Sequence, residues 1–175
     1  MLETARLRLV PWVTEHLLTL VEEPAHFTER FGHPLAEGLR DHFVSGETSP
    51  EWVAMLRSSP GADPWAFGFA VVHRESGQVM GSVGFKGPPD ADGTVEIAYG
   101  IARAFEGQGY ATEAAEAGLS FALADPRVRR VVAHTMPQEG ASPAILRKLG
   151  FAFAGEIVDP VDGPVWRWER RRGEA

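Results

Sequence analysis

The chain has 175 residues, 44% of them hydrophobic and 23% charged, which is typical of one folded domain spanning residues 1–175. It contains no cysteine, which excludes disulfides, thiolate metal ligands and a cysteine nucleophile. A formal net charge of −7 argues against general nucleic-acid binding. There is no apolar run of the ~20 residues that a membrane span needs, and no signal-peptide core. We therefore expect a cytoplasmic protein with no nucleic-acid or membrane partner.

The first half of the chain shows short strand and helix patterns separated by turns rich in proline and glycine. Thr14 is placed to cap a helix, and Pro50 follows a serine at a typical helix start. The expected elements are strands at 6–10, 65–73 and 78–85 and helices at 14–22, 35–44 and from Pro50 onward.

The second half contains a strand–helix–strand pattern, which is followed by a short helix and two more strands. The expected elements are strands at 94–101, 128–135, 151–158 and 165–168, a helix at 110–123 and a short helix within 141–151. Strands joined by short turns pair antiparallel, whereas a crossover through a helix makes two strands parallel. The pattern thus predicts an α+β fold with a mostly antiparallel sheet.

A glycine-rich turn between the strand at 94–101 and the next helix is the first candidate site. Gly107 and Gly109 precede a helix start, where backbone N–H groups lack intrahelical partners and favour an anion. The turn lacks the lysine of a Walker motif, and Thr112 replaces the third glycine of a dinucleotide motif. A pyrophosphate-bearing cofactor is one interpretation, and an ordinary strand–turn–helix is the alternative.

A second motif lies at residues 141–151, after the strand at 128–135. Ser142 is expected to be the N-cap of a short helix, with Pro143 at its first position and Gly150 at its end. The motif therefore predicts another helix N-terminus that follows a buried strand.

Three stretches together are similar to a known family. Residues 106–114 and 141–151 resemble the two acyl-CoA motifs of the GNAT N-acetyltransferases, and residues 2–12 look like the start of the RimJ/RimL-type branch. That branch acetylates the N-termini of ribosomal proteins and related amines. The resemblance implies a GNAT fold: six to seven strands with a splayed parallel central pair, flanked by about four helices. It also implies a homodimer.

The resemblance implies acetyl-CoA as cosubstrate and no metal. Main-chain groups of the glycine turn would bind the pyrophosphate, and those near Ile101 would hold the pantetheine or the thioester carbonyl. The implied cofactor-binding residues are Ile101, Ala102, Arg103, Gly107, Gln108, Gly109, Tyr110, Ala111, Thr112 and Ser142. Two residues depart from the family pattern. Glu106 stands where the family usually has Gln or Arg, and Glu139 stands where it usually has Asn.

The implied reaction is direct attack of a primary amine on the thioester in a ternary complex. Glu96 is our first candidate base, since it shares a strand face with the small residues Ala98 and Gly100. Asp159 is the second candidate, and Ser142 matches the family serine near the sulfur. A structural carboxylate and a turn residue are the alternative roles for Glu96 and Asp159.

The acceptor is expected to be a protein N-terminal α-amine or a small-molecule amine such as a polyamine or aminoglycoside. A different class stays open: a non-catalytic CoA-binding or sensor module, which Glu106 and Glu139 favour. A purely structural protein without a cofactor is the third alternative.

Overall fold

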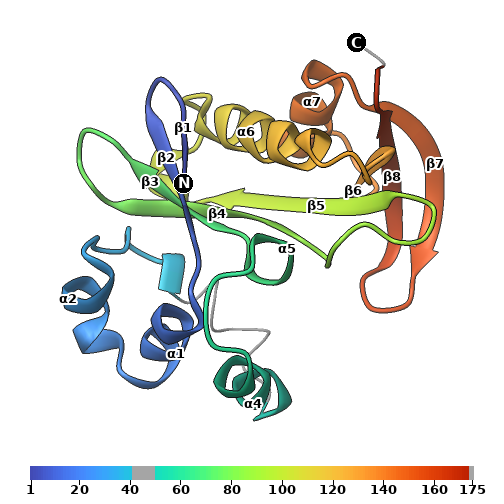
Figure 1. The fold of residues 1–175 in the computed structure, drawn as a ribbon. Helices are drawn as coiled ribbons and strands as arrows, with labels where there is room; N and C mark the ends of the chain where they lie inside the picture. The colour runs from blue at the N-terminus through green and yellow to red at the C-terminus, as the bar shows by residue number, and fades with distance from the viewer. Residues whose placement is uncertain (41–49, 174–175) are drawn as a thin grey trace.

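A computed structural model describes residues 1–40 and 50–173, and Figure 1 shows one twisted sheet with helices on both faces. The strands are β1 (Leu2–Glu3), β2 (Leu7–Pro11), β3 (Phe69–His73), β4 (Val79–Phe85), β5 (Thr94–Ile101), β6 (Arg130–Thr135), β7 (Ala152–Asp159) and β8 (Gly163–Arg171). Their order is β1-β2-β3-β4-β5-β6-β8-β7, and only the β5–β6 pair is parallel. The predicted α+β class is confirmed. The strand number is eight rather than six to seven, because the two-residue β1 is too short to show alternation.

The described helices lie on the two faces of the sheet. They are α1 (Thr14–Glu22), η1 (Pro24–His26), α2 (Phe27–Phe31), α4 (Pro50–Ser58), α5 (Pro64–Phe67), η2 (Arg103–Phe105), α6 (Tyr110–Ala124) and α7 (Ala141–Lys148). In Figure 1, α6 and α7 lie above the sheet, whereas α1, α2 and α4 lie below its β2–β4 half. Figure 1 draws α5 just below β5 and shows no labelled helix below β6 and β8.

Successive side chains along each strand point to opposite faces of the sheet, so the hydrophobic core forms one cluster on each face. In β3, Phe69 and Val71 pack in the cluster that includes Ala114 of α6, whereas Val72 packs with Leu20 of α1 in the other cluster. Strand β3 is therefore apolar on both faces. In β5, Val95 and Ile97 join the α6 cluster, while the residues between them face the opposite side.

The parallel pair separates after a few residues. Strands β5 and β6 pair only from Thr94 opposite Arg130 to Glu96 opposite Val132. Beyond Glu96, β5 stays paired with β4, and β6 stays paired with β8. The expected splay of the central strands is thus confirmed, and Glu96 lies where the gap opens.

Two local predictions are wrong for identifiable reasons. The strand expected from Trp65 begins at Phe69, because Asp63 and Pro64 start the short helix α5. The Asp63 carboxylate accepts a hydrogen bond from the Trp65 N–H at 2.9 Å, which is an N-cap. Thr14 is the first residue of α1 rather than its cap, and its hydroxyl accepts from the Gly61 N–H.

The helix expected at 35–44 is only partly observed. Leu35 forms a bridge with Val79, and helical conformation begins at Leu39. Residues 41–44 lie outside the described part of the chain. Over the ranges that are described, no helix is long and apolar enough to cross a membrane.

Close packing of α6 on the sheet depends on Gly118. A Cβ added there would lie 2.4 Å from Val83 Cγ1 and 3.3 Å from Ile97 Cδ1. Overpacking of a core costs about 1–3 kcal/mol, while alanine in place of a helical glycine gains about 1 kcal/mol. We predict that Gly118→Ala lowers the free energy of unfolding by about 1 kcal/mol in urea titrations. Ser120→Ala, on the exposed face of the same helix, is the control and should be neutral; an unchanged Gly118→Ala would contradict the packing.

Candidate active site

The glycine turn before α6 presents a run of free backbone donors. Gly107 and Gly109 have φ of 73° and 82°, the left-handed region that glycine adopts without strain. The first helical hydrogen bond runs from the Glu113 N–H to the Gly109 carbonyl. Within the described residues, none of the six N–H groups from Gly107 to Thr112 has an acceptor. Six consecutive donors that lead into a helix N-terminus are suited to binding an anion.

A cavity of about 560 Å³ lies against this turn. Its walls come from the end of β5, the glycine turn with the start of α6, and the start of α7. The lining residues are Tyr99, Gly100, Ile101, Phe105, Glu106, Gly107, Gly109, Tyr110, Ala111, Thr112, Ala141, Ser142, Ala144 and Ile145. The two motifs identified in the sequence, at residues 106–114 and 141–151, thus line one cavity. This cavity lies beside the part of β5 that is not paired with β6.

The free edge of β5 adds two further donors. The Ala102 N–H donates to the Met80 carbonyl at 2.7 Å, and hydrogen-bonded pairs alternate along an antiparallel ladder. The N–H groups of Gly100 and Ala98 therefore point toward β4, whereas those of Ile101 and Tyr99 point into the gap. This geometry suits the proposed contact of Ile101 with a pantetheine or a thioester carbonyl.

Seven of the ten predicted cofactor-binding residues line the cavity: Ile101, Gly107, Gly109, Tyr110, Ala111, Thr112 and Ser142. Ala102, Arg103 and Gln108 do not line it. The Ala102 N–H is engaged by β4, and Arg103 borders a smaller hollow beside Gly38. Gln108 contributes differently, because its carbonyl faces Arg6 on the other side of the turn.

Ser142 and Tyr99 are the polar side chains where β5 meets α7. Ser142 is the second residue of α7, whose N-cap is Gly140 and has no side-chain hydrogen bond, so the predicted capping role of Ser142 is wrong. Its hydroxyl is therefore available to the cavity. The Tyr99 hydroxyl is buried without a hydrogen bond of normal geometry. Burial raises the pKa of Tyr99 to about 12, an effect that the neighbouring Ser142 partly offsets, so Tyr99 keeps its proton at neutral pH.

Glu96 lies on the opposite face of β5, in a short charged array. Its Oε1 accepts from Lys86 Nζ at 2.8 Å and lies 3.0 Å from His134 Nδ1. The Glu96 and His134 side chains are only 19% and 12% exposed. Hydrogen bonding to Glu96 raises the pKa of Lys86, which stays cationic. Oε2 has no partner among the described residues, so one carboxylate oxygen is fixed and the other is open.

Asp159 lies near this array but is engaged in its own turn. Its Oδ1 accepts from the N–H groups of Val161 at 2.8 Å and Asp162 at 3.0 Å. These two hydrogen bonds, from Asp162 and Val161, lower the pKa of Asp159, and the charges of Lys86 and His134 add to the effect. A carboxylate held in its ionised form is a weaker proton acceptor, which argues against Asp159 as the base.

The two unusual glutamates have different surroundings. Glu139 accepts two hydrogen bonds of 2.7 Å from the Arg147 guanidinium, which lowers the pKa of Glu139 and offsets its charge. Glu106 is exposed on the cavity wall and has no ion pair within the described ranges. Glu106 is therefore the one that places negative charge beside the anion site.

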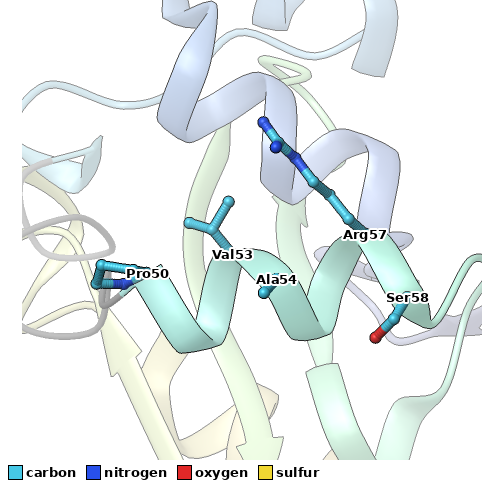
Figure 2. Close-up of a pocket in the computed structure, with 5 residues that line it drawn as sticks. All are labelled: Pro50, Val53, Ala54, Arg57 and Ser58. Atoms are coloured by element: carbon cyan, nitrogen blue, oxygen red, sulfur yellow. The ribbon is translucent and has the colours of Figure 1, made fainter.

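A second hollow, of about 680 Å³, lies on α4 and is drawn in Figure 2. It is lined by Pro50, Val53, Ala54, Arg57 and Ser58. Figure 2 shows these side chains on a single helix, and Arg57 is paired with Glu22 of α1. Its lining comes from one helix, whereas the cavity at the glycine turn is walled by three elements and adjoins N–H groups that have no acceptor among the described residues, so that cavity is the better candidate site.

The cavity fits the diphosphate and thioester parts of acetyl-CoA by its donor set. Free N–H groups of the turn match the diphosphate, and the gap-facing N–H groups of β5 match a carbonyl. In the part of the chain with described coordinates, no group of three or more His, Asp or Glu side chains is arranged to hold a metal ion.

Comparisons with known proteins agree with this geometry. The family model described as the acetyltransferase (GNAT) domain matches residues 6–152. The uncharacterized N-acetyltransferase YjdG of Bacillus subtilis is 32% identical over 91 residues, which cover 52% of this chain and 52% of that protein. The uncharacterized N-acetyltransferase p20 of Bacillus licheniformis is 28% identical over 91 residues, or 52% of this chain and 51% of that protein. This chain thus matches about half the length of these curated relatives.

Solved structures match over almost the whole chain. Ribosomal-protein-S5-alanine acetyltransferase from Vibrio fischeri has a TM-score of 0.67 and 16% identity, covering 98% of this chain and 96% of that one. RimL, a ribosomal L7/L12 α-N-protein acetyltransferase, in complex with coenzyme A, has a TM-score of 0.63 and 16% identity, covering 96% and 95%. These likenesses establish the fold. Because the family model covers most of the chain, the protein belongs to the GNAT acetyltransferase family.

Sequence reasoning missed three features of the site. Lys86, which follows β4, and His134 of β6 both contact Glu96, and spacing along the chain gives no signal for these contacts. Tyr99 had a usable signal, since it lies on the α6 side of β5 by alternation with Glu96. Its proximity to Ser142 depends on how α7 docks and could not be read from either motif.

The raised pKa of Tyr99 predicts a specific loss of stability in alkali. An unfolded tyrosine ionises near pH 10, whereas folded Tyr99 holds its proton to about pH 12. Between these values the unfolded state loses a proton that the folded state keeps, so stability falls as pH rises, by up to about 1.4 kcal/mol per pH unit. We predict that Tyr99→Phe flattens this slope in urea titrations from pH 9 to 11. Identical slopes for the variant and the wild type would contradict the burial of this hydroxyl.

Proposed function

We propose that the protein is an acetyl-CoA-dependent N-acetyltransferase that transfers an acetyl group to a primary amine by direct attack in a ternary complex. The observation that carries this proposal is the run of free N–H groups from Gly107 to Thr112, placed beside the β5–β6 gap. The cofactor-side cavity lies on one face of the sheet and Glu96 on the other. The gap between the strands is where the two substrates would meet.

Acetyl-CoA supplies the activated acetyl group, and the chain's residues supply the other requirements. Fixed N–H donors at Tyr99 and Ile101 would polarise the thioester carbonyl and stabilise its developing negative charge. Removal of one such donor costs about 3 kcal/mol in well-studied enzymes. These donors belong to the backbone of a paired strand, so they need no rearrangement to act.

The attacking amine must be neutral, and Glu96 is the proposed base. Three residues of extended chain separate Glu96 from Tyr99, roughly 10 Å, so a water relay fits the distance better than direct transfer. A protein α-amine has a pKa near 7.7–8.0 and needs less help than an aliphatic amine, whose pKa lies well above 7. We therefore favour a protein N-terminus or another weakly basic primary amine as the acceptor, with a polyamine or aminoglycoside as alternatives.

The leaving thiolate needs a proton or a hydrogen-bond donor. Two polar side chains line the cavity, Ser142 and Tyr99. Ser142 does not cap α7, and Tyr99 keeps its proton at neutral pH. We assign Ser142 as the donor to the sulfur, with Tyr99 as its neighbour in the same wall. Asp159 stays a second, weaker candidate base, and the homodimer stays a prediction.

The proposal is tested by calorimetric titration with acetyl-CoA. We predict micromolar binding by the wild type and at least a 100-fold loss in Ala111→Asp, which places a carboxylate at the helix N-terminus that lines the cavity. Ser120→Asp, on the exposed face of α6, is the control and should bind normally. Binding that survives in Ala111→Asp would refute the anion site. Binding without acceptor-dependent CoA release from any amine would indicate a non-catalytic sensor.

The base assignment predicts a pH-dependent defect. Glu96→Gln should lower kcat/KM at pH 7 by about 100-fold, because general base catalysis contributes factors of this size. The defect should shrink to a few fold near pH 9.5, where an α-amine is already neutral. Glu156→Gln, an exposed carboxylate on β7, should behave as the wild type at both pH values. An unchanged pH–rate profile in Glu96→Gln would remove Glu96 from the mechanism.

A further inference from the structure

The N-terminal motif at residues 2–12 has no place in the proposed chemistry, yet one of its side chains contacts the glycine turn. Arg6 Nε donates to Glu113 Oε2 at 2.7 Å, and Arg6 Nη1 donates to the Gln108 carbonyl at 2.9 Å. The guanidinium carbon also lies 4.3 Å from the centre of the Tyr110 ring. One side chain thus links the turn to the first residues of α6.

Arg6 is itself held in place by several contacts. Glu113 Oε1 accepts from the Thr4 hydroxyl at 2.6 Å and from the Arg6 N–H at 2.8 Å. Arg74 Nη1 donates to the Thr4 carbonyl at 2.7 Å and fixes the turn between β1 and β2 from its other side. Both Glu113 oxygens are therefore used to anchor residues 4–6, and the Arg6 guanidinium has little freedom to leave Gln108.

The contact with Gln108 determines where the next N–H points. The Gln108 carbonyl and the Gly109 N–H belong to the same trans peptide unit, so they point in opposite directions. Arg6, which is not part of the cavity wall, holds the carbonyl on the rear side of the turn. The Gly109 N–H must then point away from Arg6, toward the cavity that Gly109 lines.

The same contact strengthens that donor. A hydrogen bond from a guanidinium to a carbonyl is charge-assisted, and it polarises the peptide unit so that its N–H becomes a better donor. Without Arg6, the Gln108–Gly109 peptide could rotate at low cost, because Gly109 on its C-terminal side has no Cβ to restrict φ. A flexible glycine turn thus acquires one fixed orientation from a residue about 100 positions away.

We propose that Arg6 is a positioning residue for the cofactor's diphosphate: it fixes the Gln108–Gly109 peptide so that the Gly109 N–H is directed at the anion. Thr4 and Glu113 hold Arg6 in the required position. The inference rests on the proposed function, since it takes the diphosphate of CoA as the anion.

The test compares two ligands that share the pantetheine arm and differ in the diphosphate. Dissociation constants are measured by NMR titration of the ¹⁵N-labelled protein with CoA and with pantetheine. We expect Arg6→Gln to weaken CoA binding about tenfold, the size of one charge-assisted hydrogen bond, and to leave pantetheine binding within about twofold of the wild type. Arg8→Gln is the matched control, because Arg8 pairs with Glu3 at 3.3 Å and does not contact the turn.

Each other outcome has a defined meaning. Unchanged CoA affinity in Arg6→Gln, or an equal loss for CoA and pantetheine, overturns the positioning role. If Arg6→Gln does not fold, Arg6→Lys keeps the charge but cannot reach Gln108 and Glu113 together, and it should show the same selective loss. Failure of the wild type to bind CoA would instead refute the proposed function, and this inference with it.

Discussion

The structure of the site depends on the point at which two parallel strands stop pairing. Strand β5 leaves β6 after Glu96, while β5 stays paired with β4 and β6 stays paired with β8. The N–H groups of Tyr99 and Ile101 then have no strand to donate to, and they face a gap instead of a ladder. A sheet that paired fully would bury these donors and leave no passage between its faces. The splay therefore creates both the free donors and the route by which two substrates would meet.

The two faces of β5 carry different chemistry because alternate residues point to opposite sides. Tyr99, Ile101 and the glycine turn belong to the α6 side, which offers an anion site and an apolar cavity. Glu96, held by Lys86 and His134, belongs to the other side, where the described helices cover mainly the β2–β4 half. The Glu96 carboxylate would thus be separated from the negative charges of the proposed cofactor by the thickness of one strand. The exception is Glu106, which lines the cavity itself.

Much of this arrangement could be predicted from the sequence, because local patterns determine it. The bounds of β5 and the start of α6 follow from alternation and from glycines before a helix-forming run, and both were predicted correctly. Ser142 was misjudged as a helix cap because Gly140, not a polar residue, precedes α7. Long-range contacts, such as Arg6 with Gln108 and His134 with Glu96, were out of reach. They depend on docking between segments about 40 to 100 residues apart, for which one sequence carries no signal. The pairing of Glu139 with Arg147 likewise required the bend between β6 and α7.

The central claim is that the backbone of the glycine turn, and not a side-chain cluster, binds the cofactor's diphosphate. The most direct measurement follows the backbone amide signals of ¹⁵N-labelled protein during titration with CoA. The account predicts that the largest shifts occur at Gly107–Thr112, with Tyr99 and Ile101 also affected and the residues of α4 unaffected. Saturating CoA that leaves the amides of Gly107–Thr112 unmoved, or that shifts α4 instead, would contradict it.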